Sequence, residues 1–512
     1  MLMPLDLFNS LTNADDTLFK DSLEKYGFIP DLLTSTCDDH KPNPQPTRMT
    51  RSIPVPFVGF SVHKDISGQQ WIGLTCAACH TGRIRIRGPA AAGEKWFIVE
   101  GAPAMIDFER FFDDVVAAVD RSPHKQVFSS VTEWLHVRHT YDHRESPSGF
   151  GRVDAFGQIF NEVSFLVGNP PNSIPTPDAP ASFPFLWDIA QHKRVQWDGS
   201  APNLGVGGDG AALRNIAETV GVFGKVQFPA ERKSLVGFKG YRSEINVENI
   251  RMAERWISTL NSPVWPTAFG PLPGSPKAGK ILYQQHCRRC HAELDLPKVY
   301  ASSAEGRKFK VGEKITPLNQ VLTDPRELVN FNGVMDTRNF YGVKDVTSPR
   351  KVFKKVGTVD RPIAVASAVA AAIFPHTTLQ ALRDGVLAFI VGSAPTGYKA
   401  RPLNGIWATA PFLHNGSVPN LRQLLTAPGA RLHYFCVGAE SFDFEDVGYK
   451  AYEKPNPSCN FANGKFEMHT GPEAEVSIGD SNVGHDYPPT GLSSMQQTDL
   501  IAYIIITLSK HD

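Results

Sequence analysis

The sequence predicts a mainly α-helical protein with long loops, and three observations support this. Apolar side chains recur at helical spacing near residues 104–120, 152–166 and 493–509, and a further helix is expected at about 246–260. The chain contains 42 glycines and 40 prolines, scattered through otherwise periodic sequence, which is typical of a loop-rich globular protein rather than of disorder. Its 512 residues suggest about three compact units with a large buried core.

Three of the expected helices show an apolar stripe, and the first of these stripes indicates core packing rather than cofactor contacts. The first stripe consists of Met105, Phe108, Phe111, Phe112, Val115 and Val119, and the second of Val153, Phe156, Ile159, Phe160, Val163 and Leu166. The last consists of Leu500, Tyr503, Ile504 and Leu508, with Ser493 or Ser494 as the expected N-cap. Between residues 170 and 184, six prolines disfavour regular helix and favour extended chain.

Charge and hydropathy exclude two classes of partner. Lysine plus arginine total 52 and aspartate plus glutamate total 52, so the chain lacks the positive charge that nucleic-acid binding requires. The longest apolar runs, 363–374 and 501–508, fall short of the roughly 20 residues of a membrane-spanning helix. We therefore expect a soluble protein that binds no nucleic acid and does not span a membrane.

Two pentapeptides carry the main chemical signal. C-A-A-C-H places Cys76, Cys79 and His80 together, and C-R-R-C-H repeats the pattern at 287–291. This is the attachment signature of c-type haem. Two cysteines three residues apart lie on one side of a helical turn, where both sulfurs can bond the vinyl groups along one haem edge. The histidine that follows can then bind the iron as its proximal ligand.

A zinc site and a redox dithiol are the alternatives, since both use C-x-x-C. Zinc would not explain the trailing histidines, and a dithiol would not require them. We therefore expect two covalently bound haem c groups, held by Cys76, Cys79 and His80 and by Cys287, Cys290 and His291. With the helical stripes, this predicts a mainly α fold with two c-type cytochrome haem domains and an intervening loop-rich region.

The expected units are an N-terminal haem domain at 1–145, a middle region at 146–265 and a C-terminal haem domain at 266–512. Covalent haem c is normally attached outside the cytoplasm, so we expect a periplasmic or secreted protein. The N-terminus shows no export signal, which suggests a mature or trimmed form. In such a compartment Cys436 and Cys459 can form a disulfide, with two buried thiols as the alternative, and Cys37 is left over.

The chain resembles the di-haem bacterial cytochrome c peroxidase superfamily, through the two C-x-x-C-H motifs and RPLNGIWATAPFLHNGSVPNLRQLL at 401–425. Further segments are similar to the RoxA-like rubber oxygenase branch of that superfamily. These segments are GLTCAACHTG, GRVDAFGQIFNEV at 151–163, PFLWD at 184–188, VGVFG at 220–224 and NVGHDYPPTGLS at 482–493. The resemblance covers most of the chain from about residue 57 and none of residues 1–56.

The resemblance implies that oxygen or peroxide reacts at the first haem, with His80 as proximal ligand, and that the second haem is six-coordinate. Peroxidases take the sixth ligand from a methionine fourteen residues after the histidine of the HNGS-type motif, but this chain has Pro428 there. The oxygenase branch uses a late histidine, which favours His485 over His414 as a metal ligand. Met468, His469 and Met495 remain alternatives. We expect His414 to be a hydrogen-bonding residue near a haem propionate.

The resemblance also suggests a pocket on the distal side of the first haem. Ala155, Phe156 and Ile159 are expected to line it, and Ala212, Leu213 and Arg214 to close it. Gln158 and Glu162 lie on the same helix; Glu162 facing the iron would favour peroxidase chemistry, but its apolar neighbours suggest that it faces solvent. Trp187 or Trp197 could relay electrons between the haems, although a buried tryptophan is most often part of a core.

Three functions follow by analogy with the family. The first is a dioxygenase that adds O2 across a carbon–carbon double bond of an isoprenoid or unsaturated fatty-acid-like substrate, either a small molecule or a polymer. The second is a peroxidase that reduces H2O2 with electrons from a small donor protein; the missing methionine weighs against it. The third is an electron carrier with both irons six-coordinate.

Overall fold

The computed structural model reveals a mixed α/β architecture rather than the mainly α fold with two haem domains that we expected. It describes residues 2–30, 57–65, 67–87, 94–203, 210–227, 242–291, 314–336, 358–362, 364–365, 369, 395–489 and 491–509. Within these residues the strands form eight small antiparallel sheets of two or three strands each. The fold-class prediction is therefore wrong. Many strands of this chain are too short to show the alternation of apolar and polar residues by which a strand is recognised in a sequence.

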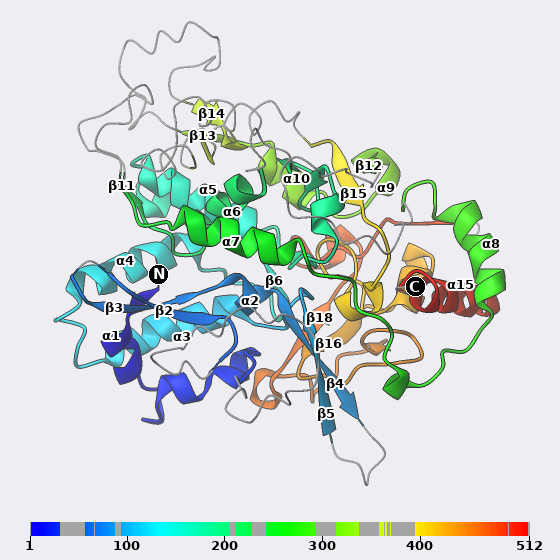
Figure 1. Cartoon of the computed structure of the whole chain (residues 1–512), viewed down its shortest axis with the longest axis horizontal. Helices are drawn as coiled ribbons and strands as arrows, with labels where there is room; N and C mark the ends of the chain where they lie inside the picture. The colour runs from blue at the N-terminus through cyan, green and yellow to red at the C-terminus, as the bar shows by residue number, and fades with distance from the viewer. Residues whose placement is uncertain are drawn as a thin grey trace, which may run out of the picture.

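The helices and small sheets are interspersed, and the hairpin of β4 (Thr81–Arg87) and β5 (Glu94–Glu100) projects at the lower edge of the view (Figure 1). The helices are α1 (Leu5–Ser10), α2 (Cys76–Cys79), α3 (Phe108–Arg121), α4 (Ser129–Asp142), α5 (Ala155–Leu166), α6 (Gly210–Gly221), α7 (Val247–Ile257), α8 (Pro276–His286), α9 (Leu318–Val321), α10 (Arg326–Phe331), α14 (Leu421–Leu424) and α15 (Ser494–Ile506). In the described part of the chain, every helix is too short or too polar to span a lipid bilayer.

The strands pair as follows. The three-stranded sheets are β1 (Met3–Pro4), β3 (Gln70–Leu74) and β2 (Phe60–Lys64), in that order, and β17 (Ala451–Tyr452), β16 (Tyr434–Gly438) and β18 (Lys465–His469). The pairs are β4 (Thr81–Arg87) with β5 (Glu94–Glu100), β6 (Arg152–Val153) with β7 (Ala181–Ser182), β8 (Arg194–Val195) with β9 (Ala201–Pro202), β10 (Val226–Gln227) with β11 (Arg242–Ser243), β12 (Lys314–Pro317) with β15 (Gly397–Ala400), and β13 (Val334–Asp336) with β14 (Thr358–Asp360).

The four helices expected near residues 104–120, 152–166, 246–260 and 493–509 are present, and polar side chains cap each of them. Asp107, Asp154 and Asn246 accept backbone N–H groups at the starts of α3, α5 and α7. Ser493 begins α15 in a reciprocal capping box with Gln496, which confirms Ser493 as the N-cap. The helix predictions are therefore confirmed, with boundaries shifted by a few residues.

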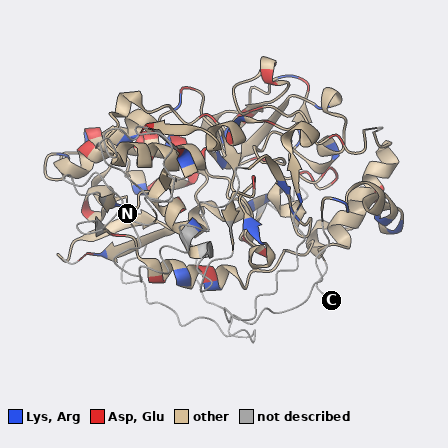
Figure 2. Ribbon diagram, turned by 90° about the horizontal axis from the view of Figure 1, so that it is seen from above, with Lys and Arg blue, Asp and Glu red and all other residues tan. Residues whose placement is uncertain are grey.

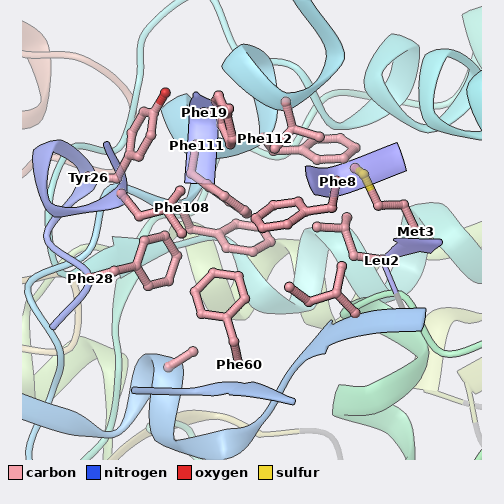
Figure 3. Close-up of a cluster of buried hydrophobic side chains, with 14 of the residues drawn as sticks. Leu2, Met3, Phe8, Phe19, Tyr26, Phe28, Phe60, Phe108, Phe111 and Phe112 are labelled. Atoms are coloured by element: carbon pink, nitrogen blue, oxygen red, sulfur yellow. The ribbon is translucent and has the colours of Figure 1, made fainter. Parts of the chain in front are cut away.

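One aromatic core joins the N-terminal segment to the β2–β3 sheet and to α3 (Figure 3). The Phe28 ring centroid lies 5.0 Å from those of both Phe60 and Phe111, with the rings edge to face. Leu2 and Met3 are buried in the same core. Residues 2–30, for which the sequence suggested no role, thus support the sheet that leads into Cys76.

A second core joins α8 and α15, which lie side by side, to the β16 sheet (Figure 1). The contact is close because α8 carries Gly279, where an added Cβ would lie only 2.0 Å from the Asp499 carbonyl oxygen. Val99 and Ala102 also belong to this core, although they lie in the expected N-terminal unit. The three-unit division at residues 145 and 265 stays a prediction.

Two of the cysteines outside the C-x-x-C-H motifs are paired. Cys436 and Cys459 form a disulfide, as predicted, whereas Cys37 lies outside the described residues.

Lysine and arginine are intermixed with aspartate and glutamate over the described elements (Figure 2), in keeping with the zero net charge of the sequence.

Candidate functional site

The first C-x-x-C-H motif lies between β3 and β4, and α2 carries its two cysteines. Thr75 precedes the helix, and the His80 N–H donates to the Cys76 carbonyl at 2.9 Å. His80 Nδ1 lies 2.9 Å from the Pro184 carbonyl oxygen, to which it can donate. Metal-ligating histidines commonly make such a bond through one ring nitrogen, which leaves the other nitrogen free to bind the metal.

The second motif has the same local geometry. It follows α8, and the His291 N–H donates to the Cys287 carbonyl at 2.9 Å. His291 Nδ1 lies 2.7 Å from the Arg401 carbonyl oxygen, while Tyr283 Oη donates to the His291 carbonyl at 2.7 Å. Burial lowers the pKa of both His80 and His291, which favours the neutral imidazole that binds a metal.

His485 faces His291, with 6.1 Å between their ring centroids. Two imidazoles bound on opposite sides of one ion, through metal–nitrogen bonds of about 2.0–2.1 Å, place their centroids roughly 6 Å apart. His485 Nδ1 is buried without a hydrogen-bond partner among the described residues. The His485 backbone is fixed, because its N–H donates to the Val321 carbonyl at 2.8 Å. These residues fit a six-coordinate iron with two axial histidines.

The other residues considered as sixth ligand are either packed against other side chains or exposed. His414 is buried and its ring stacks on Tyr398 at 3.9 Å between centroids. Met468 is buried in the second core, and His469 stacks on Tyr434 at 4.5 Å. Met495 is 77% exposed. Of the five candidates, which are these four residues and His485, His485 is the one that the structure places beside the His291 ring.

A narrow cavity lies between α5, α6 and α10, with room for about one water-sized molecule, at about 20 Å³. Its apolar lining is Phe156, Ile159, Phe160, Ala201, Ala217, Phe331, Pro362 and Val365, and its polar lining is Gln196, Ser200, Arg214 and Glu218. Phe156 and Ile159, which were expected to line the distal pocket, both line this cavity. Ala155 does not line this cavity and instead packs, like Cys79, against the first core.

The charges of this cavity act on the first motif. Burial, with a smaller contribution from Arg214, lowers the pKa of His80 to about 4. Burial, with smaller contributions from Cys76 and Glu218, raises the pKa of Cys79 to about 12. Sequence reasoning did not single out Glu218. Its spacing of four residues from Arg214, on one face of a helix, was the available signal.

Glu162 does not face solvent, so that expectation is wrong. Its side chain is buried, accepts a hydrogen bond from Tyr141 Oη at 2.6 Å, and lies 3.6 Å from Arg138 Nη1. A buried carboxylate needs such partners, and α4 supplies both of them. Glu162 also does not line the cavity, and Gln158, which is buried too, lies outside the lining.

One short segment links the supports of the two proximal histidines. Pro184 faces His80, and the next residue, Phe185, carries the Arg401 guanidinium 3.4 Å from its ring centroid. Arg401 Nη2 also donates to the Phe185 carbonyl at 2.7 Å, while the Arg401 carbonyl faces His291.

Both tryptophans of the relay hypothesis border this segment. Trp187 is fully buried and stacks on Phe185 at 4.5 Å. The Trp197 ring centroid lies 5.7 Å from the Arg401 guanidinium carbon, and its Nε1 donates to the Ser182 carbonyl. Their positions are compatible with either a relay or core packing.

Comparison with known protein families finds a match that includes Arg401. Residues 397–436 match a RoxA-like, cytochrome c-like domain. The RoxA-like domain contains Arg401 and His414 and contains neither C-x-x-C-H motif. A cytochrome c-like domain implies covalently bound haem c, and a cytochrome-type oxidoreductase, without fixing the number of haems.

Two relatives occur in Sinorhizobium fredii (strain NBRC 101917 / NGR234). The "Uncharacterized protein y4iJ" is 26% identical over 97% of this chain and 86% of its own length. The "Uncharacterized protein y4iM" is 24% identical over 59% of this chain and 57% of its own length. The first similarity extends over both C-x-x-C-H motifs as well as the RoxA-like domain, and the names of the two relatives describe no activity.

Proposed function

We propose that this protein is a di-haem c oxidoreductase. Cys76, Cys79 and His80 would hold the first haem, and Cys287, Cys290 and His291 the second, with His485 as its sixth ligand. The observation that carries this proposal is the repeated local geometry, in which each motif histidine faces a backbone carbonyl through Nδ1. Two observations support different roles for the two irons: the His291–His485 spacing at the second motif, and the electrostatic effect of the cavity residue Arg214 on His80 at the first.

When bound, haem c supplies redox chemistry with a small oxidant at an open iron and electron storage at a closed one. This chain's own residues would then perform three tasks. The Pro184 and Arg401 carbonyls orient the two proximal imidazoles. Phe156, Ile159 and Phe331 exclude water from the cavity. Trp187 or Trp197, beside Phe185 and Arg401, would pass electrons between the two sites.

We propose a dioxygenase that adds O2 across a carbon–carbon double bond of an apolar substrate, such as an isoprenoid or an unsaturated fatty-acid-like chain. The mostly apolar lining and the small volume of the cavity support a small apolar guest such as O2. The similarity to a RoxA-like domain supports the same chemistry by analogy. We also propose a periplasmic or secreted location, which the Cys436–Cys459 disulfide favours.

The first test counts haems and follows oxygen. Protein from a host competent in cytochrome maturation should carry two covalent haems per chain. Replacing either motif's cysteine pair with serine should halve the haem content, whereas replacing Cys436 and Cys459 should leave it unchanged. Haem content is measured by pyridine haemochrome absorbance, and oxygen uptake with squalene or oleate by an oxygen electrode.

The outcomes separate the alternatives. One haem in the unmodified protein would contradict the di-haem proposal. Two haems with no oxygen uptake, and no binding of oxygen, peroxide or cyanide at either iron, would indicate an electron carrier. Two haems with rapid turnover of peroxide, but no uptake of oxygen, would indicate a peroxidase.

One observation favours peroxide reduction as a second candidate. Peroxidase chemistry needs a side chain that moves a proton between the two peroxide oxygens, and the Glu218 carboxylate lines the cavity beside Arg214. Burial raises the pKa of Glu218 above that of a free carboxyl, which is the direction that favours its use as a proton donor. A small electron-donor protein would then be the partner.

Under this second candidate, Glu218→Gln should lower peroxide turnover by about 100-fold or more, because the amide cannot transfer the proton. The matched control is Glu248→Gln on α7, whose side chain is 75% exposed. Stopped-flow measurement of peroxide consumption compares the two variants. Equal rates in both would eliminate Glu218 as the acid–base group.

A further inference from the structure

A cluster of three metal-binding side chains lies on the outer side of α3 and α4. It consists of Asp113 on α3, His139 on α4 and His143, which caps the C-terminal end of α4. His139 and His143 are four residues apart, so the helix places both rings on one face, with their centroids 4.8 Å apart. Neither the haem motifs nor the cavity involve these residues.

The donor atoms converge on one carboxylate oxygen. Asp113 Oδ1 lies 2.9 Å from His139 Nε2 and 3.3 Å from His143 Nδ1. Around a tetrahedral ion with bonds of about 2.0–2.2 Å, neighbouring ligand atoms lie roughly 3.3–3.5 Å apart. The ion would therefore need only a small outward shift of the carboxylate or of one ring.

The donor set and its exposure indicate the metal. Two imidazole nitrogens and one carboxylate oxygen form a ligand set typical of Zn²⁺, and one that Cu²⁺ and Ni²⁺ also accept. Side-chain exposure is 38% for Asp113, 29% for His139 and 46% for His143. The site is thus reachable from solvent, and water can occupy the fourth position.

We propose that Asp113, His139 and His143 form a Zn²⁺ site that clamps the C-terminal end of α4 to α3. α3 belongs to the first core, and α4 supplies Arg138 and Tyr141 to Glu162 on α5. The clamp would stabilise the helix that supports the back of the cavity. The competing explanation is an ion pair in which Asp113 bridges two protonated histidines without a metal.

The chain provides a matched control one turn away. His136 on α4 lies 3.0 Å from Asp120 on α3, and its other ring nitrogen lies 2.7 Å from the Thr132 carbonyl. This pair shares the helices and the residue types of the proposed site. It offers one imidazole and one carboxylate, with both ring nitrogens of His136 already engaged.

The experiment titrates EDTA-treated holoprotein with ZnCl2 by isothermal calorimetry at about pH 7.5, where imidazoles are mostly neutral. The unmodified protein and His136→Ala should bind one Zn²⁺ at this site, and Zn²⁺ should raise the thermal midpoint of both. His139→Ala and His143→Gln should weaken this binding by more than about 100-fold, beyond the cost of losing an outer-shell partner. Circular dichroism checks that each variant is folded.

Two results would overturn the proposal. One is the absence of a stoichiometric Zn²⁺ site in the unmodified protein, which would leave Asp113 as an ion-pair partner. The other is equal Zn²⁺ affinity in His136→Ala and in His143→Gln. His143 lies at the exposed end of α4. Neither the Zn²⁺ affinity nor the thermal midpoint depends on enzymatic activity or on how the haems are ligated.

Discussion

Replacing His485 with alanine is expected to abolish the low-spin signal of one haem and leave the other haem unchanged. The reason is that His485 lies across from His291 at the spacing of two axial ligands, and its buried Nδ1 has no other partner among the described residues. Without this ligand the second iron becomes high-spin or binds water. Electron paramagnetic resonance of the oxidised protein measures the change, and added imidazole should restore the low-spin signal.

The matched control is His469→Ala, which removes an exposed imidazole that stacks on Tyr434. It should leave both haem signals intact. If His485→Ala retains the low-spin spectrum of the unmodified protein, another residue is the sixth ligand. Haem content measured on the same samples distinguishes loss of the ligand from loss of the cofactor.

Replacing Arg138 with methionine should destabilise the protein by about 3–5 kcal/mol, since it leaves buried carboxylates without their counter-charge. The Arg138 side chain is 1% exposed and lies 2.9 Å from Asp142 and 3.6 Å from Glu162. Its guanidinium also donates to the Gly221 carbonyl on α6 and lies 4.7 Å from the Phe223 ring centroid. Arg138 thus connects α4, α5 and α6, and the midpoint of urea unfolding measures its loss.

Two comparisons make the Arg138 result specific. Arg251→Met removes one member of a partly exposed pair with Glu248 and should cost no more than about 0.5 kcal/mol. Adding Asp142→Asn and Glu162→Gln to Arg138→Met should restore much of the lost stability, because no buried charge is then left unpaired. Similar losses of unfolding free energy in Arg138→Met and Arg251→Met would contradict the idea that the burial of Arg138 and its carboxylate partners causes the destabilisation.

The sequence was informative where the relevant interactions are local. Helix spacing predicted α3, α5 and α15, and a cap residue was predicted for α15, because both signals lie within one or two turns of the helix itself. The haem motifs are equally local, since their three ligands lie within five residues. The disulfide and the pairing of His485 with His291 span longer distances, and the sequence could suggest them only through context or resemblance.

The fold class failed because the sheets depend on pairing between short strands. β8 and β9 have two residues each, which is too few for an alternating pattern to be visible. β12 pairs with β15, which begins 83 residues later, so no turn signal marks the pair. The alternation of arginine and isoleucine in residues 83–87 was a genuine strand signal that the helical interpretation overlooked.

The sequence predicted the residues around the cavity only in part, for a similar reason. Phe156 and Ile159 were expected beside the first haem, whereas Glu218 comes from a different helix and is brought there by the packing of α6 on α5. Glu162 was misplaced because its partners, Tyr141 and Arg138, lie on α4. A sequence pattern reports the face of one helix, and only the assembled fold determines which neighbour covers that face.

Arg401 and the Pro184–Phe185 segment hold the proximal imidazoles of both motifs by their backbone carbonyls. Such carbonyls set the basicity of an axial imidazole and thereby the reduction potential of its iron. In the proposed di-haem protein, a movement of this segment would reach both imidazoles, because the Arg401 guanidinium donates to the Phe185 carbonyl next to Pro184. The electronic environments of the two irons would thus be linked through the backbone of one short segment.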